Sequence, residues 1–170
     1  MANRAKSSII HLRVTPEHKR YIVALSNLDN TTETAIISGM VERAATERCV
    51  DGCMGLIPLT TAVGYAEQGE VPAIKMLRMF YLAPAALSHK ERLMAQAIME
   101  NEFYFAGNVE IFAEDECHWP RMGLIPKINM DAVASHLNVL NDYAMFTISN
   151  PKMRMDYPTY RKATDADSEV

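Results

Sequence analysis

The side chains with the most evident chemistry lie near the amino terminus, at alternate positions of one short segment. Ile9, His11 and Arg13 would share one side of an extended chain, because successive side chains of a strand point to opposite faces. An arginine can donate two hydrogen bonds to guanine O6 and N7, a histidine can donate or accept one, and an isoleucine offers apolar contact, for example with a thymine methyl group. This face therefore has the chemistry to contact base edges, with Arg13 as its strongest candidate.

The charge distribution agrees with a nucleic-acid-binding arm. The chain has a formal net charge of -4 at pH 7, yet residues 1–20 contain five basic residues and one acidic residue. Residues 51–170 contain ten basic and sixteen acidic residues. Such asymmetry is typical of a basic segment that binds nucleic acid joined to an acidic body. We expect Arg4 and Lys6 to contact phosphates, the alternative being a solvated arm.

One strand must position these side chains. Residues 8–14 alternate apolar and polar side chains from Ile10 onward, which predicts a short, half-buried strand. A lone strand cannot satisfy its backbone groups or bury its apolar face, and no other strand is predicted nearby. An identical strand from a second copy, antiparallel about a two-fold axis, is the simplest partner. The first 50 residues therefore predict an obligate homodimer.

Two helices are predicted after this strand. Thr15 is typical of a helix cap and precedes a proline at the first helical position, so we expect a helix over about 16–28. A polar turn follows, and apolar residues at helical spacing predict a second helix from Thr31 or Thr32 to about residue 48. The free amides and positive dipole end of that helix make both threonines candidates for a phosphate anchor, the alternative being an ordinary helix cap.

The amino-terminal third of the chain resembles a ribbon-helix-helix domain, since it has the run IHLRVTPE at positions 10–17, then a helix, a polar turn and a second amphipathic helix. Within that family it is most similar to antitoxins whose ribbon ends in Leu-Arg-Val/Leu-Thr-Pro-Glu. The resemblance implies a dimeric β-ribbon that enters the DNA major groove with His11 and Arg13 toward the bases. Three departures are Asn30, where glycine is common, Gly39 inside the second helix, and Ile9, which is apolar at an outward ribbon position.

The remainder of the chain is predicted to be mostly helical. Ser88 and Glu91 form a capping box that opens a long helix, which Gly107 interrupts, and the cluster Phe103–Phe105 could equally support a strand. The predicted elements are helices over 60–68, 71–82, 89–112 and 130–143, and a loop over 120–126. We divide the chain into a ribbon-helix-helix domain at 1–50, a helical domain at 51–158 and a frayed polar tail at 159–170, with the joint near residues 51–55.

Two weak metal-ligand patterns are present. One is a cysteine and histidine set, and the other is a carboxylate and histidine set at a predicted helix end. Their members are Cys49, Cys53, Cys117 and His118 for the first, and Glu110, Glu114, Asp115 and His118 for the second. Neither has the spacing of a standard zinc module or of a repeated carboxylate-histidine site. We favour free thiols and an exposed acidic helix end, and expect no metal.

Composition narrows the remaining function classes. With 49% hydrophobic residues, 22% charged residues, 7 glycines and 8 prolines, the chain is a folded globular protein and not a disordered or collagen-like one. It contains no apolar run of membrane-spanning length and no signal-peptide core, so we expect a soluble, cytoplasmic protein. It has no nucleophile elbow, phosphate loop or glycine-rich nucleotide turn, so we expect neither an enzyme nor a cofactor.

These observations predict a mainly α protein that binds double-stranded DNA as a homodimer and regulates transcription, as a repressor or an antitoxin-like autoregulator. Dimers could assemble further on DNA, and residues 51–158 could bind a toxin or another protein, aided by some of the 12 methionines if these do not simply fill the core. Two alternatives remain. One is a plasmid or conjugation accessory protein, and the other is a helical partner-binding module that the amino terminus dimerises.

Overall fold

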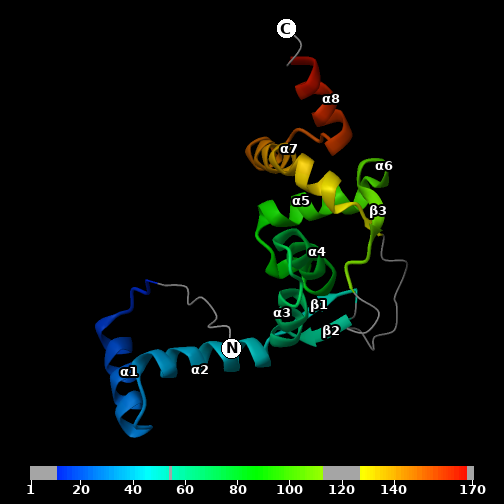
Figure 1. Cartoon of the computed structure of the whole chain (residues 1–170). Coiled ribbons are helices and arrows are strands. Elements are labelled where there is room, and N and C mark those ends of the chain that lie inside the picture. Colours follow the sequence, from blue (N-terminus) through cyan, green and yellow to red (C-terminus); the bar gives the residue numbers. More distant parts are fainter. Residues whose placement is uncertain (1–10, 54, 113–126, 168–170) are drawn as a thin grey trace. The chain divides into compact units, whose positions relative to one another are not determined.

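The computed structural model describes residues 11–53, 55–112 and 127–167 (Figure 1). These residues form eight α-helices, one two-stranded antiparallel sheet and short connecting elements, which confirms the prediction of a mainly α protein. The chain divides into two compact units, 1–44 and 45–170, called here the amino-terminal unit and the body. Each unit is described by itself.

The amino-terminal unit contains α1 (Pro16–Leu28) and most of α2 (Glu33–Glu47), close to the two predicted helices. The hydroxyl of Thr15 accepts a hydrogen bond from the backbone amide of His18 at 3.2 Å, so the predicted cap of α1 is present. Thr32 does the same for α2, accepting from the amide of Ala35 at 3.1 Å. Both helix starts are therefore determined by residues within one turn.

The end of α1 explains why asparagine replaces glycine in the turn. Asn30 has a φ of 48°, in the left-handed region that asparagine tolerates better than most residues. The amide of Thr31 donates to the carbonyl of Ser26 at 3.0 Å, and the amide of Asn30 donates to the carbonyl of Asn27 at 3.4 Å. This is the Schellman pattern, which satisfies the last carbonyls of a helix.

The body begins after the unit boundary within α2 and has ten elements. They are β1 (Cys49–Gly52), β2 (Gly55–Pro58), α3 (Leu59–Glu67), α4 (Pro72–Leu82), the 3-10 turn η1 (Pro84–Ala86), α5 (His89–Glu100), α6 (Glu102–Phe105), β3 (Ala106–Val109), α7 (Met130–Ser149) and α8 (Tyr157–Asp167). The predicted helices over 60–68 and 71–82 are confirmed as α3 and α4. The helix predicted over 130–143 is confirmed as α7, which continues to Ser149. The loop predicted over 120–126 lies outside the described residues.

A β-hairpin lies at residues 49–58, where the sequence predicts the joint between two domains. β1 and β2 pair antiparallel, with Val50 opposite Ile57 and Gly52 opposite Gly55. Gly55 has a φ of 75°, which a glycine adopts without steric cost. These strands were not predicted from sequence, because four residues with no clear apolar and polar alternation give no strand signal.

The prediction of one long helix over 89–112 is wrong beyond residue 100, because α5 ends at Glu100. Its start is as predicted, with both hydrogen bonds of the capping box between Ser88 and Glu91 present. The chain then forms the single turn α6 and strand β3. A Cβ atom on Gly107 would lie 2.3 Å from the backbone nitrogen of Asn129, so only glycine allows this approach. The amide of Gly107 donates to the carbonyl of Lys127 at 2.9 Å, which the helical prediction could not foresee.

The prediction of a frayed polar tail is also wrong over the residues described. Asp156 accepts a hydrogen bond from the amide of Thr159 at 2.9 Å, and α8 follows. Tyr157, at the start of this helix, is only 1% exposed. A tyrosine ring of this size buries enough apolar surface to anchor an otherwise polar segment.

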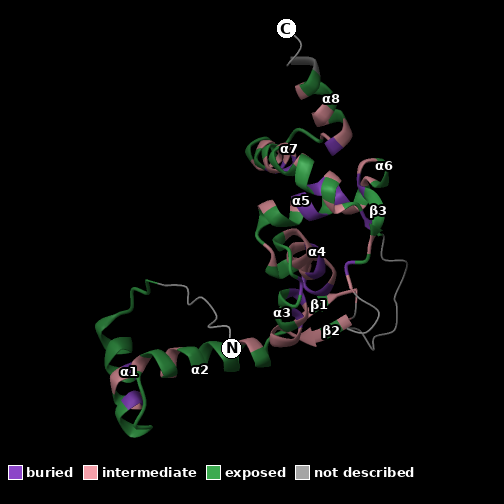
Figure 2. Ribbon diagram, in the orientation of Figure 1, coloured by how far each residue is buried: buried purple, intermediate pink, exposed green. Residues whose placement is uncertain are grey.

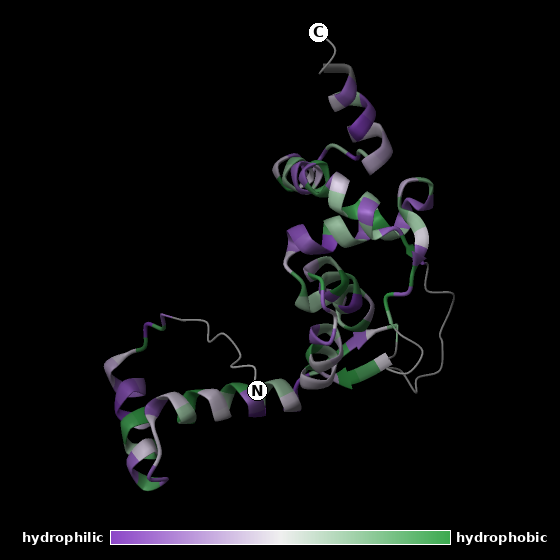
Figure 3. Ribbon diagram, viewed as in Figure 1, coloured by the Kyte–Doolittle hydropathy of each residue, from purple (hydrophilic) through white to green (hydrophobic). Residues whose placement is uncertain are grey.

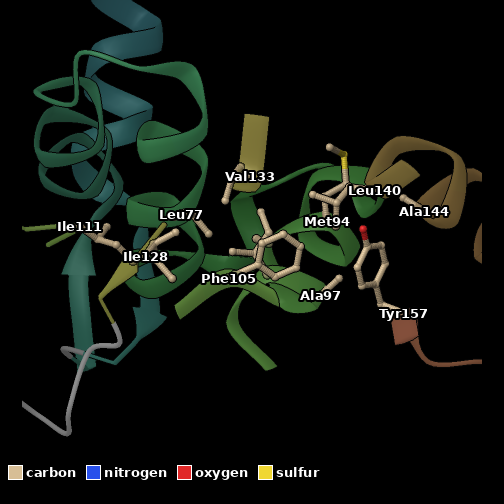
Figure 4. Packing of buried hydrophobic residues seen from close by; sticks show 12 residues of the cluster. Leu77, Met94, Ala97, Phe105, Ile111, Ile128, Val133, Leu140, Ala144 and Tyr157 are labelled. Atoms are coloured by element: carbon tan, nitrogen blue, oxygen red, sulfur yellow. The ribbon is translucent and has the colours of Figure 1, made fainter. Parts of the chain in front are cut away.

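Most of the core lies in the body, between α4, α5, α6, α7 and the start of α8 (Figures 2 and 4). Its largest fully buried side chains include Leu77, Phe105, Leu140 and Tyr157. A smaller cluster joins α3 to the end of α4. In the amino-terminal unit only Ile22 and Ser26 are buried among the described residues. The two units therefore differ sharply in how much core they contain.

Candidate nucleic-acid interface

The structure describes part of the predicted DNA-contacting face. His11 and Arg13 lie in the segment 11–14, which is exposed and is assigned neither helix nor strand. This segment makes no backbone hydrogen bond to other described residues of its own chain. Ile9, Arg4 and Lys6 lie outside the described residues. The predicted strand over 8–14, which requires a second copy, therefore stays a prediction.

The start of α2 is the second predicted contact. The hydroxyl of Thr32 is used in capping the helix, and the amide of Thr31 is used in closing α1. A phosphate bound here would therefore be held by the amides of the first helical turn rather than by the Thr32 hydroxyl. Glu33 follows directly and forms an exposed ion pair with Lys19, which contributes about 1 kcal/mol or less.

Among the described residues of this unit, Glu17 accepts a hydrogen bond and Glu33 forms an ion pair, whereas not every basic side chain has an acidic partner. Glu17 accepts a hydrogen bond from the hydroxyl of Tyr21 at 2.5 Å, and this bond raises the pKa of Tyr21. Arg13 and Arg20 are exposed, and neither forms an ion pair within the described part of the chain. Two guanidinium groups close to the segment 11–14 are therefore free to attract phosphate.

The helices of this unit leave an apolar face open. No residue of α2 is buried, although it has apolar side chains at helical spacing (Figure 3). Met40 and Val41 are exposed, and Ile36 and Ile37 are half-buried. An amphipathic helix in a folded protein normally buries such a face. The amino-terminal unit therefore lacks a core sufficient for its own stability.

The two weak metal patterns are not supported where they are described. No three histidine, cysteine or acidic residues within residues 11–53, 55–112 and 127–167 are grouped to hold a metal ion. Cys49 and Cys53 form no disulfide bond within the described residues, and Glu110 forms an ion pair with Lys127 at 2.8 Å. Cys117, His118, Glu114 and Asp115 lie outside the described residues.

Sequence reasoning missed a polar cluster in the body. Nδ1 of His136 lies 2.7 Å from the hydroxyl of Tyr157, and Nε2 lies 3.0 Å from Nη1 of Arg161. The Arg161 guanidinium also lies over the ring of Tyr104, 5.0 Å from its centroid. These residues come from α6, α7 and α8. They are too far apart in the sequence to form a recognisable motif. Only the i, i+4 spacing of Tyr157 and Arg161 was visible beforehand.

A second missed feature is a buried arginine. Arg78 on α4 is almost fully buried, and its Nε donates to the carbonyl of Ile111 at 2.7 Å. Its Nη1 donates to the carbonyl of Tyr65 at 3.1 Å. The guanidinium lies 5.5 Å from the centroid of the Phe112 ring. Arg78 thus ties α3 and the chain after β3 to α4, a structural role.

No known protein family, curated protein or solved structure matches this chain. None of the helices in the described ranges has both the length and the apolar character needed to cross a membrane.

Proposed function

We propose that this protein is a homodimeric, sequence-specific DNA-binding protein that regulates transcription, as a repressor or an antitoxin-like autoregulator. The observation that carries the proposal is the segment 11–14, which is exposed, is neither helix nor strand in the single chain, and makes no backbone hydrogen bond to other described residues of its chain. It leads directly into the capped helix α1. A second copy of this segment, paired antiparallel, would satisfy its backbone groups and form a ribbon of the width that enters the major groove.

The open apolar face of α2 supports the dimer. A helix of 15 residues with none buried loses the tertiary contacts that normally stabilise helices. A second copy related by a two-fold axis would bring the same face of another α2 against it, because such an interface is self-complementary. Leu12 and Val14, which alternate with His11 and Arg13 and are exposed in one chain, would join this core.

The side chains on the opposite face of the ribbon would read DNA. Arg13 would donate two hydrogen bonds to a guanine, His11 would make one bond to a base edge, and Ile9 would contact a thymine methyl group. Arg4, Lys6 and the free backbone amides of the first turn of α2, which follows Thr31 and Thr32, would hold phosphates. These phosphate contacts would make binding fall as salt concentration rises.

Selection of bound duplexes from a random pool by the full-length protein tests the proposal. We expect a two-fold symmetric site to be enriched. Arg13→Ala should then weaken binding to that site by about tenfold to about hundredfold, because a bidentate contact contributes about 1–3 kcal/mol of discrimination. The dimer should stay intact, because the Arg13 side chain faces away from its core.

Arg154→Ala is the matched control, since it removes the same charge from an exposed position of the body. It should leave the specific affinity unchanged. Equal losses in the two variants, or no duplex bound above the nonspecific level at physiological salt, would contradict the DNA-reading role.

The body offers a second candidate function, the binding of a protein partner such as a toxin. The observation in its favour is Phe103 on α6, whose side chain is 92% exposed. Leu137 and Met145, two turns apart on α7, are also exposed. If the selection enriches no duplex, the favoured function of the protein becomes partner binding by the body, with the amino-terminal unit serving only to dimerise it. A plasmid or conjugation accessory role would instead give a site at a transfer origin or centromere.

A further inference from the structure

A chain of three side chains joins α8 to α7. The ring of His136, on α7, lies between the hydroxyl of Tyr157 and the guanidinium of Arg161, both on α8. Tyr157 is buried next to Ala144 and Leu140 (Figure 4), and burial raises its pKa to about 12. The tyrosine hydroxyl therefore stays protonated at any physiological pH, so the only titratable member of the chain in that range is His136.

The hydrogen bonds determine the protonation state of the ring. A guanidinium group has donors and no acceptor, so Nε2 of His136 must accept the bond from Arg161. The single proton of the neutral ring then lies on Nδ1, which donates to the oxygen of Tyr157. A second proton, taken from solvent, could only bind Nε2. It would remove the one acceptor that Arg161 uses and place two cations 3.0 Å apart.

The groups facing His136 come from two neighbouring helices. From α8 these are Tyr157, Arg161 and Asp165, and from α6 the titratable group is Tyr104. Asp165 lies 3.4 Å from Nε of Arg161 and offsets part of its charge. Among the described residues of α5, which packs along α7, no charged group shifts the pKa of His136.

We propose that the contact of α8 with α7 is an acid-sensitive latch, in which protonation of His136 breaks its bond to Arg161 and releases α8. The release would uncover a surface on α7 that α8 covers at neutral pH. Tyr143 and Phe146 belong to this surface, with ring centroids 5.6 Å and 5.3 Å from that of Tyr160 on α8. The latch is a property of the body and does not depend on the proposed DNA-binding function.

The direction of the pH effect follows from linkage. Burial, and then the charge of Arg161, lower the pKa of His136 below its ordinary value of 6.5, while Asp165 opposes them. The released state therefore binds protons more readily than the latched state. The contribution of His136 to the latch is fully present above pH 6.5 and decreases as pH falls through 6.5 and on toward the lower pKa of the latched state. Over that window the released fraction rises by up to about tenfold per pH unit, because one proton is taken up.

Hydrogen exchange of the full chain between about pH 8 and about pH 5 tests the latch, with protection factors corrected for the intrinsic exchange rate. We expect amides of α8 to lose protection as pH falls while amides of α5 keep theirs. In His136→Gln the protection of α8 should not depend on pH over this range. His89→Gln, a histidine exposed at the start of α5, is the control and should behave like the parent protein.

A second pair of variants covers the case in which His136→Gln does not fold. Arg161→Met removes the cation, so α8 should be less protected at neutral pH and less acid-sensitive than in the parent protein, with the part that is due to the burial of His136 remaining. Arg161→Lys keeps a cation, so acid sensitivity should remain. The latch is overturned if α8 protection in the parent protein is independent of pH, or if Arg161→Met and Arg161→Lys respond to acid equally.

Discussion

The amino-terminal unit and the body use helices of similar length in opposite ways. α2 has 15 residues and buries none of them, whereas α5 has 12 residues and buries Met94, Ala95, Ala97 and Ile98. Since most helical stability in proteins comes from packing an apolar face, the body can be stable as one chain. The amino-terminal unit has the helix caps, but among its described residues it buries only Ile22 and Ser26.

Exposed apolar residues also have a different setting in the two units. In the body, exposed apolar side chains such as Phe103 stand beside a complete core, and single exposed apolar residues are normal. In the amino-terminal unit, α2 buries no residue and α1 buries only Ile22 and Ser26. Three substitution pairs test whether this contrast is real.

The largest effect is expected from Phe105→Ala, because this fully buried ring is in the centre of the body core. The substitution should lower the free energy of unfolding of the body by about 3–5 kcal/mol, measured by denaturant titration. Phe103→Ala, two residues away and exposed, should change it by less than about 0.5 kcal/mol. Similar values for the two variants would mean that the body core is not organised as described.

An intermediate effect is expected from Val41→Asp on the open face of α2. If a second copy covers this face, the unpaired carboxylate should weaken the dimer by about tenfold to about hundredfold, measured by sedimentation at several concentrations. Unfolding of the body should not change. Ala35→Asp, at an exposed position about 120° around α2 from Val41, is the charge-matched control. Dimers unaffected by Val41→Asp would remove the proposed interface.

The smallest effects are expected from alanine substitutions of two glycines, Gly52 in β1 and Gly39 in α2. A Cβ on Gly52 would lie 2.4 Å from the carbonyl oxygen of Leu82, so Gly52→Ala should destabilise the body by about 1–3 kcal/mol. A Cβ on Gly39 in α2 meets nothing within 4 Å. Gly39→Ala should therefore stabilise α2 by about 1 kcal/mol, measured by thermal unfolding. A tolerated Gly52→Ala contradicts the close packing of β1 on α4. A weaker dimer in Gly39→Ala would show that the second copy approaches this side of α2.

The sequence by itself determined the parts of this protein that depend on neighbours within one helical turn. The caps at Thr15, Thr32 and Ser88 are hydrogen bonds between residues three apart, so the starts of α1, α2 and α5 could be predicted. Residues 11–14 are all exposed in the single chain, so the predicted alternation of His11 and Arg13 with Leu12 and Val14 is not tested there. Their pairing with a second copy remains a prediction, because it concerns another chain.

Only the tertiary structure decided the features that depend on residues far apart in the chain. The path of β3 depends on Gly107 lying against Asn129, and α8 depends on the burial of Tyr157 beside α7. The cluster around His136 joins residues 21 and 25 positions apart. Such contacts involve side chains with no shared motif, and their free energy appears only when the core forms. Local patterns therefore predicted where most helices begin, and long-range packing decided how the chain continues at β3, where α8 packs and which polar groups meet.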